Sequence, residues 1–419
     1  MFALVDAAGF YASCEKVIDI KLRDRPVIVL SNNDGCVVAA CPIAKKLGAP
    51  KFEPYFKVKD FVRKNKVVVR SSNYELYGDL SDRFMKCAHQ FAPEQYIYSI
   101  DECFLDLHRC NITNWIEYGW KIRRTIWQET KIPVCVGIAP TLTLAKAGNF
   151  ASKNIKGCNG VMAISTPETR KQVLQIMPVE KVWGIGRQLT KHLNLLGIET
   201  AWDLANQPTK RMRREFNVNV ERTVRELNGK PCLVWDQQRA TKKEIFSTRS
   251  TGKRITRLNE LKQALAFHAN IVTRKARKQN TAIKELVVFA QNSPHDKNSD
   301  YYSRSGLHQF IIATTDTTQV SAAATALANQ IFDSNVRFYR VGVGAIRLEP
   351  KLPLQNDLFR ENEDKIELME CLDEINSLWG MDTIHLAAQG ITKSFAMKRE
   401  LLSPQYTTRW KHLPQIKCR

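Results

Sequence analysis

The sequence predicts an α+β protein built from several domains, and three features carry this prediction. The chain has 419 residues, 44% of them hydrophobic, which is enough for about two to four domains with packed cores. Strand-like runs alternate with helical stretches over residues 84–165, and the pattern becomes helical over residues 166–236. A polar, basic link at 239–248 separates these parts from a further mixture of strands and helices at 245–350.

The individual elements follow from hydrophobic periodicity and turn residues. An apolar run at the N-terminus ends in Asp6 and is followed by a small-residue turn, a helix, and a second strand at RPVIVLS. Further strands are expected at YIYSI, CFLDL and IPVCVGIA, with a helix at NWIEYGWKIRRTIWQE. Beyond the link, NELKQALAFHANIVTRKARKQ predicts a long helix, and ELVVFAQ, HQFIIAT and RFYRVGVGAI predict strands. The last part begins with the polar connector NDLFRENEDK and ends in a basic tail.

Charge is the most informative feature of the composition. Lys and Arg number 63 against 42 Asp and Glu, a formal net charge of +21. Such an excess favours a polyanionic partner, most simply nucleic acid, although general solubility or an anionic lipid surface are alternatives. We expect no membrane span or signal peptide, because no run of about 18 apolar residues or basic-then-apolar leader occurs. The 11 cysteines are scattered and form no C-x-x-C pair, which favours a reducing cytoplasm over zinc or disulfides.

Three acidic residues stand at the ends of predicted strands. Asp6 ends the first strand, and Asp101 and Glu102 lie together in YSIDECFLDL. If these strands are neighbours in one sheet, three carboxylates converge on one edge and suit Mg²⁺. Two such ions could activate a 3′-hydroxyl and stabilise a leaving pyrophosphate. Acids at strand ends are common, however, and taken alone the adjacent pair reads more simply as an exposed turn.

Several longer segments decide between these alternatives. Their sequence is similar to that of the Y-family translesion DNA polymerases, most closely the UmuC-type catalytic subunit of bacterial DNA polymerase V, from Met1 to about Arg409. The segments are DAAGFYASCE at 6–15, VLSNNDGCVVA at 29–39, SSNYELYGDLSDR at 71–83, YSIDECF at 98–104, VGIAPTLTLAK at 136–146, VWGIGR at 182–187, FNVNVERTVRELNGKPCL at 216–233 and LLSPQYTTRW at 401–410.

The resemblance implies the right-hand architecture of that family. Its expected parts are a palm at 1–12 and 80–165, small fingers at 13–79, a helical thumb with a helix-hairpin-helix at 166–236, a linker at 237–244, a little finger at 245–350, and a C-terminal tail with clamp-binding and partner-binding regions at 351–419.

The resemblance also assigns the catalytic and nucleotide-binding residues. The side chains of Asp6, Asp101 and Glu102, with the backbone carbonyl of Ala7, would hold two Mg²⁺ ions, Glu102 being nearest the primer hydroxyl. Tyr11 would be the steric gate that excludes a 2′-hydroxyl. The remaining nucleotide-binding residues would be Phe10, which by itself reads as a core aromatic residue, and Lys45 and Lys153, which by themselves read as surface lysines.

The chain departs from the pattern of its branch at a few positions. AACPIAK replaces a charged fingers motif, which places Ala40, Pro42 and Ile43 there, and Leu142 stands where a palm lysine is typical. We expect activity to survive, with weakened nucleotide binding or altered fidelity. The resemblance assigns no role to Lys146 or Asp106, and Asp106 reads as structural.

Two groups of residues are expected to hold DNA. In VWGIGRQLTKHLNLLGI, the turn amides can face a DNA phosphate without recognising the base sequence. A Gly-x-Gly alone is weak evidence for such a contact, but the amphipathic helix and the second turn at LGI strengthen it. In the little finger, basic residues would grip the backbone, although each alone reads as a solvated charge. The residues are Gly184, Ile185 and Gly186 in the turn, and Arg249, Lys253, Arg254, Arg337, Arg340 and Arg347 in the little finger.

The connector contains QNDLF at 355–359, in which Gln355, Leu358 and Phe359 resemble the bacterial motif that inserts a Leu-Phe pair into the sliding clamp. Local packing is the alternative. The resemblance implies as partners primer–template DNA, deoxynucleoside triphosphates, a processed UmuD-type dimer, the RecA filament and the clamp.

The sequence thus predicts an error-prone polymerase for translesion synthesis in the SOS response to DNA damage. A non-catalytic DNA-binding or checkpoint protein is the second hypothesis, which the intact Asp6, Asp101 and Glu102 disfavour. A palm-type nucleotidyl cyclase is disfavoured by the helix-hairpin-helix and the basic third domain.

Overall fold

The structure is a computed structural model that describes residues 1–233, 241–296, 299–351, 364–380, 382–391 and 395–413. The chain forms two compact units, of which one comprises Met1–Gln238 with Glu400–Arg419 and the other Arg239–Arg399. The expected C-terminal tail is therefore divided: its last described residues belong to the first unit. Within the described ranges, every helix is too short or too polar to cross a bilayer.

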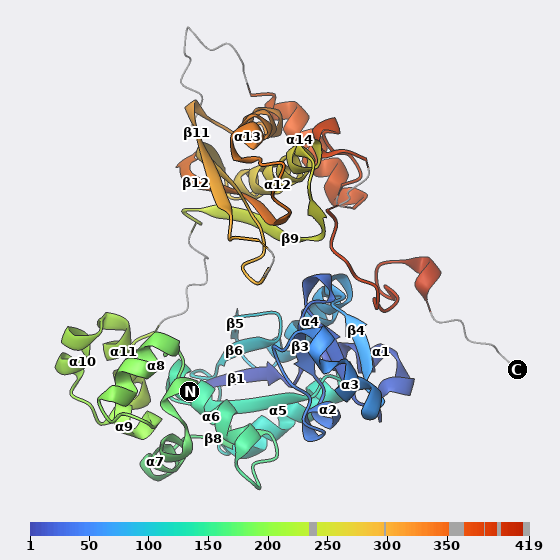
Figure 1. Cartoon of the computed structure of the whole chain (residues 1–419). Helices are drawn as coiled ribbons and strands as arrows, with labels where there is room; N and C mark the ends of the chain where they lie inside the picture. The colour runs from blue at the N-terminus through green and yellow to red at the C-terminus, as the bar shows by residue number, and fades with distance from the viewer. Residues whose placement is uncertain (234–240, 297–298, 352–363, 381, 392–394, 414–419) are drawn as a thin grey trace, which may run out of the picture. The chain divides into compact units, whose positions relative to one another are not determined.

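A five-stranded sheet organises the first unit, with β1 at its centre (Figure 1). β1 pairs antiparallel with both β6 and β7. The strands, in spatial order, are β5 (Glu94–Ile97), β6 (Glu102–Asp106), β1 (Phe2–Ala7), β7 (Val134–Ala139) and β8 (Val161–Ala163).

Alternation along β1 places its side chains in two cores. Ala3 and Val5 pack in one core with Ile122 of α5 (Trp115–Thr130), whereas Leu4 packs in the other with Leu144 of α6 (Leu142–Asn154). Because successive strand residues point to opposite faces, this sheet is covered on both sides. Its central strand accordingly reads as a continuous apolar run that ends at Asp6.

Helix α6 lies unusually close to the sheet because β7 carries a glycine. A Cβ atom on Gly137 would lie 2.2 Å from the backbone nitrogen of Asn149 and 2.3 Å from the carbonyl oxygen of Ala145. Thr141 caps the helix by accepting a hydrogen bond from the Leu144 amide. The glycine and the cap together fix the helix against the edge at which Asp6 lies.

A smaller three-stranded sheet follows β1 in the chain. Its order is β3-β2-β4, with β2 antiparallel to β3 and parallel to β4. The strands are β2 (Val27–Leu30), β3 (Val37–Ala40) and β4 (Val68–Ser71), and the neighbouring helices are α1 (Phe10–Ile18), α2 (Pro42–Lys46), α3 (Tyr55–Lys64) and α4 (Tyr74–His89).

The described part of the segment expected to be helical, residues 166–233, contains five α-helices. They are α7 (Pro167–Ile176), α8 (Arg187–Leu195), α9 (Ala201–Ala205), α10 (Thr209–Glu215) and α11 (Val218–Leu227). Leu193, Leu204 and Val224 share a core with α6 and with Phe104 of the sheet. The helical cluster is therefore packed onto the five-stranded sheet.

The second unit has the order β-α-β-β-α-β and a four-stranded antiparallel sheet, β11-β10-β12-β9. Buried residues of α12 and α13, such as Leu265 and Leu327, share a core with the strands. Its elements are β9 (Ile245–Ile255), α12 (Leu258–Lys278), β10 (Thr281–Gln291), β11 (Ser303–Thr314), α13 (Thr317–Ile331), β12 (Phe338–Pro350) and α14 (Ile366–Leu378).

Candidate active site

Strand pairing brings the three acidic residues to one edge of the five-stranded sheet. Asp6 on β1 lies directly opposite Glu102 on β6. Asp101 immediately precedes β6, and its carbonyl oxygen accepts a hydrogen bond of 2.8 Å from the backbone amide of Ala7. The condition for a shared site, that the two acid-bearing strands are neighbours in one sheet, is met, so the adjacent acids lie beside a third one.

Two lysines of α6 pair with these acids. Lys153 Nζ lies 2.6 Å from Asp6 Oδ1, and Lys146 Nζ lies 2.8 Å from Glu102 Oε1. The lysines are about two turns apart and so share one helix face. Asp101 Oδ1 accepts a hydrogen bond of 2.5 Å from Ser99 Oγ. Each acid thus has a partner from the protein.

The electrostatics of Glu102 indicate crowded negative charge. Burial raises the pKa of Glu102, the hydrogen bond and charge of Lys146 lower it, and the charges of Asp6 and Asp101 raise it again. In the described part of the chain, no three His, Cys, Asp or Glu side chains form a ready-made metal cluster. The donor chemistry nevertheless fits Mg²⁺, because only oxygen ligands are offered and a cation would relieve the repulsion among the acids.

Lys146, to which sequence reasoning assigned no role, lies among three aromatic rings. Its Nζ is 4.3 Å from the ring centroid of Tyr98, 5.7 Å from that of Phe104 and 5.2 Å from that of Trp183. The indole of Trp183 also donates a hydrogen bond to the Tyr98 hydroxyl. Since Trp183 belongs to the VWGIGR turn, Lys146 connects Glu102 with the helix-hairpin-helix region.

A cluster of three tyrosines surrounds the expected steric gate. Tyr11 stacks on Tyr77 with ring centroids 4.6 Å apart and an interplanar angle of 16°, and Tyr74 packs edge-on against both rings. Tyr11 is half-buried, and its pKa is raised by burial and by the nearby Tyr74 and Asp101. Phe10 is buried in the core, as its sequence context predicts. Sequence reasoning missed Tyr74 and Tyr77, which are spaced by one helical turn in SSNYELYGDLSDR.

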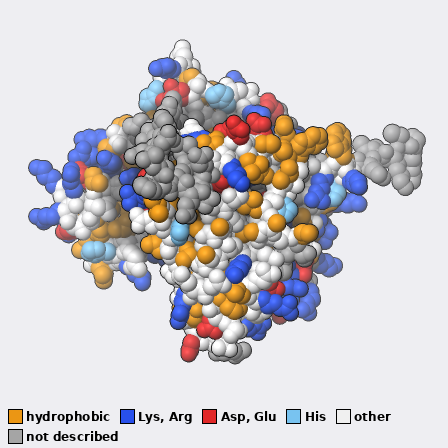
Figure 2. Space-filling view, turned by 90° about the horizontal axis from the view of Figure 1, so that it is seen from above, with side chains coloured by type: hydrophobic (Ala, Val, Ile, Leu, Met, Phe, Trp, Pro, Cys, Tyr) orange, Lys and Arg blue, Asp and Glu red, His pale blue; other side chains and the backbone are white. Residues whose placement is uncertain are grey.

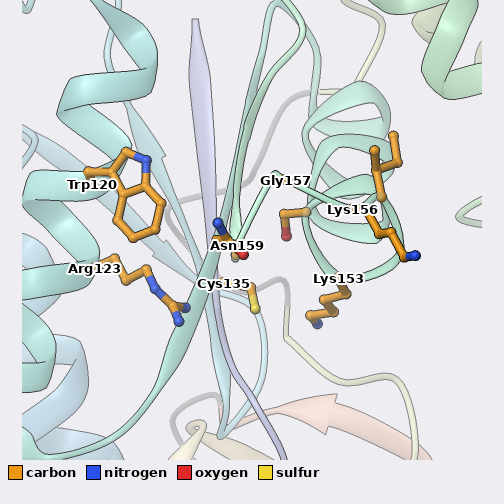
Figure 3. Close-up of a pocket in the computed structure, with 10 residues that line it drawn as sticks. Trp120, Arg123, Cys135, Lys153, Lys156, Gly157 and Asn159 are labelled. Atoms are coloured by element: carbon orange, nitrogen blue, oxygen red, sulfur yellow. The ribbon is translucent and has the colours of Figure 1, made fainter.

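Basic residues gather beside Asp6. The pKa of Lys45 is lowered by burial and by the charges of Lys51 and Lys153, whereas the charge of Asp6 raises it. A cleft of about 740 Å³ adjoins Lys153. In Figure 3, Arg123 on α5 faces this cleft from one side, and Lys153 and its neighbours at the end of α6 line the other. Such a cluster suits a polyphosphate.

The unusual residues of the fingers and palm are accommodated without disturbing the acids. Ala40 is buried at the end of β3, and Pro42 takes the first position of α2, followed by Ile43. Leu142 is buried in the first turn of α6. Asp106 accepts a hydrogen bond from the amide of His108, which agrees with a structural role.

The helix-hairpin-helix turn has the backbone expected from its glycines. Gly184 has a φ of 88°, and Gly186 is the N-cap of α8 without a side-chain cap. The amide of Ile185, however, donates to the Val182 carbonyl within the turn. In this structure the Ile185 amide is therefore hydrogen-bonded within the turn, and the glycines have the expected backbone.

The predicted DNA-binding arginines of the second unit lie on β9 and β12, apart from Arg337. Arg249 lies over the ring of Phe267, Arg254 lies over that of Tyr339, and Arg340 donates to Thr248. Arg347 pairs with acidic residues of the same sheet. Lys253 is on β9, and Arg337 directly precedes β12.

Basic side chains are widespread on the face shown in Figure 2, where acidic ones form only small groups. The predicted clamp-binding residues Gln355, Leu358 and Phe359 lie outside the described residues.

Comparisons with known proteins agree with this geometry. The solved structure of a Y-family DNA polymerase chimera matches with a TM-score of 0.64 and 22% identity, covering 82% of this chain and 98% of that chain. The fold class is therefore that of the Y-family DNA polymerases. Family models match residues 5–149 (impB/mucB/samB family), 242–358 (impB/mucB/samB family C-terminal domain) and 367–416 (a domain of unknown function, DUF4113).

Relatives at high coverage define the group more narrowly. Protein UmuC of Salmonella typhimurium is 42% identical over 100% of both chains. Protein SamB of Salmonella typhimurium is 38% identical over 100% of both, and protein MucB of Escherichia coli is 37% identical over 99% of both. The chain belongs to the impB/mucB/samB family of Y-family DNA polymerases.

Proposed function

We propose that this protein is a template-directed, error-prone DNA polymerase that performs translesion synthesis in the SOS response by two-metal-ion nucleotidyl transfer. The observation that carries the proposal is the convergence of Asp6, Asp101 and Glu102 at one sheet edge, with basic residues of α6 beside them.

The acids would provide the metal ligands. Asp6, Asp101, Glu102 and the carbonyl of Ala7 would hold two Mg²⁺ ions, which supply Lewis acidity toward the primer 3′-hydroxyl and charge neutralisation at the leaving pyrophosphate. Asp6 would exchange its pairing with Lys153 for this role. No protein nucleophile is required, because positioning and charge stabilisation are sufficient for phosphoryl transfer.

The neighbouring residues would bind the incoming nucleotide. Lys45 and Lys153 would neutralise the triphosphate, and their closeness, visible in the lowered pKa of Lys45, supports this role. The Tyr11 ring would lie under the sugar and leave no room for a 2′-hydroxyl. Its stacking on Tyr77 holds the ring in a defined position, as a steric gate requires.

The remaining proposed contacts are with DNA and with partner proteins. The Gly184–Gly186 turn and the basic residues of β9 and β12 would hold the primer–template backbone, so binding should weaken steeply with salt. Leu358 and Phe359 would insert into the sliding clamp. Membership in the UmuC group supports a processed UmuD-type dimer and the RecA filament as further partners, acting in the cytoplasm.

The proposal is tested by primer extension across an abasic template with Mg²⁺, the UmuD-type dimer and activated RecA. We expect Asp101→Ala to abolish extension and Asp106→Asn, an acid on the same strand that bonds to His108, to retain it. Extension by Asp101→Ala equal to that of the unaltered protein would favour the second hypothesis, a non-catalytic DNA-binding or checkpoint protein.

The clamp contact has a separate test. Replacing both Leu358 and Phe359 with Ala should leave extension on a bare template unchanged and abolish its stimulation by the clamp. Undiminished clamp stimulation would remove this contact from the proposal.

A further inference from the structure

The segment at the end of the chain is bound to the small sheet of the first unit. The backbone amide of Leu401 donates a hydrogen bond of 3.0 Å to the Ser71 hydroxyl. The Leu401 carbonyl accepts a hydrogen bond of 3.0 Å from the Ser71 amide. The amide of Glu400 donates to Asp34 Oδ2 over 2.9 Å. These contacts join residues that are 330 and 366 positions apart, and those of Leu401 lie at the last residue of β4.

The same segment contacts the start of α4 through Ser403. Asn73, which caps α4, donates from its amide nitrogen to Ser403 Oγ over 2.9 Å and to the Ser403 carbonyl over 3.2 Å. The Asn73 side-chain oxygen accepts from the amide of Leu76. Ser403 therefore helps to orient the residue that begins the helix carrying Tyr74 and Tyr77.

Ser403 also reaches a buried carboxyl group on the helix that carries the steric gate. Glu15 on α1 is 3% exposed, and its Oε1 accepts hydrogen bonds from the Ser403 hydroxyl at 3.0 Å and the Tyr77 hydroxyl at 2.7 Å. Burial raises the pKa of Glu15, and these two hydrogen bonds, together with the charge of Arg70, oppose that rise. The carboxyl group thus ties α1, α4 and the C-terminal segment together.

The contacts form one path from the C-terminal segment to the nucleotide pocket. Ser403 bonds to Glu15, Glu15 holds the Tyr77 hydroxyl, and the Tyr77 ring stacks on Tyr11 at 4.6 Å. Tyr11 and Glu15 also lie one turn apart on α1, so the same helix carries the last residue of the path and the carboxyl group that Ser403 contacts. The last step of the path is a ring contact: Tyr11 stacks on Tyr77, and Tyr74 packs edge-on against both rings.

We propose that Ser403 is a positioning residue for sugar discrimination: through Glu15 and Tyr77 it fixes the ring of Tyr11. This inference rests on the proposed role of Tyr11 as the steric gate. The inference gives a function to the segment that begins at Glu400, after the second unit. This segment lies within residues 367–416, which match the domain of unknown function. Loss of the Ser403 hydroxyl leaves the buried Glu15 with one hydroxyl donor fewer, and the ring pair gains freedom.

The test compares single-nucleotide insertion of a ribonucleotide and the matching deoxyribonucleotide by the full chain in its active complex. Ser403→Ala and Tyr77→Phe each remove a hydroxyl that contacts Glu15, and Ser403→Thr retains one. Thr408→Ala removes an exposed hydroxyl from the same segment and is the matched control. Thermal unfolding of each variant is measured in parallel.

We expect Ser403→Ala and Tyr77→Phe to raise the ribonucleotide-to-deoxyribonucleotide ratio of kcat/KM by about 3- to 10-fold, as loss of one buried hydrogen bond allows. The rise should come mainly from the KM values. Ser403→Thr and Thr408→Ala should keep the original ratio. A purely structural role would instead lower insertion of both nucleotides equally, together with the unfolding temperature, and that result would overturn the inference.

Tyr11→Ala separates this inference from the proposed function. If Tyr11→Ala leaves sugar preference unchanged, the gate assignment itself is wrong, and the inference is lost with it. If Tyr11→Ala relaxes sugar preference while Ser403→Ala and Tyr77→Phe do not, the gate stands and the path from Ser403 is refuted.

Discussion

Glu226 offers the sharpest test of how the helical cluster supports the active site. It lies on α11 and is fully buried. One carboxylate oxygen accepts a hydrogen bond of 3.0 Å from the amide of Thr143, in the first turn of α6. The other accepts from the amides of Cys232 and Leu233, at 2.6 and 3.1 Å. A single side chain therefore satisfies three backbone amides and caps the helix that carries both active-site lysines.

Replacement of Glu226 by Gln keeps the size of the side chain but turns one acceptor into a donor. If the side-chain oxygen of the new Gln accepts from the amides of Cys232 and Leu233, its NH₂ group faces the Thr143 amide. The Thr143 amide is then left without an acceptor. A hydrogen bond to a charged group contributes about 1.5–3 kcal/mol, and an unsatisfied buried donor costs about 1–3 kcal/mol. We expect the first unit to lose about 2–4 kcal/mol of unfolding free energy.

The loss should be local enough to measure at α6 itself. Hydrogen exchange of peptides covering Leu142–Asn154 reports the opening free energy of this helix, and single-nucleotide insertion should fall by about 10- to 100-fold as Lys146 and Lys153 shift. Glu221→Gln is the matched control on the same helix, because Glu221 pairs with the partly exposed Arg213 and Arg225. Protection of α6 that is equal in the two variants would refute the capping role.

Further predictions concern both units. Burial and the charges of Arg249 and Lys275 lower the pKa of His268 to about 3, against 6.5 when unfolded, so only the unfolded state gains a proton as pH falls below about 6.5. The second unit should therefore lose about 2 kcal/mol of unfolding free energy between pH 7 and pH 5, measured by hydrogen exchange of α12. A His268→Gln variant whose unfolding free energy falls equally over this pH range would exclude His268 as the source. Gly137→Ala should destabilise the first unit by about 3 kcal/mol or more, because the new Cβ atom would meet the backbone of α6. Gly78→Ala is the control, since a Cβ atom there would have nothing within 4 Å. Equal unfolding temperatures of the two variants would contradict the close approach of α6 to the sheet. Arg277→Ala should release α14 from α12, because Arg277 donates two hydrogen bonds of 2.8 Å to Asp373. The variant should lose about 3 kcal/mol of unfolding free energy. Unchanged protection of α14 against hydrogen exchange would disprove this.

Much of the fold and of the catalytic centre could be predicted from local sequence. Strands show as short apolar runs, and an acid that ends such a run stands at a sheet edge whatever the neighbours are. Asp6 could be placed at the end of an apolar run in this way. Asp101 and Glu102 lie just before β6 and at its first residue, and the family motifs around them were needed to choose between a metal site and an exposed turn. The glycines of the helix-hairpin-helix turn were readable for the same reason, because backbone conformation at a tight turn is a local property.

The tertiary structure alone decided which distant side chains share these sites. Lys146 reads as an ordinary helical lysine until packing places it between Glu102 and three aromatic rings. Glu226 and Ser403 carry no sequence signal of their roles, since the contact of Glu226 with Thr143 spans 83 positions and that of Ser403 with Glu15 spans 388. Periodicity records which face of an element is buried, but the side chain that meets it is set by the packing of whole elements. The acids could be found one at a time; the residues that hold them, and the ring of Tyr11, depend on the folded arrangement.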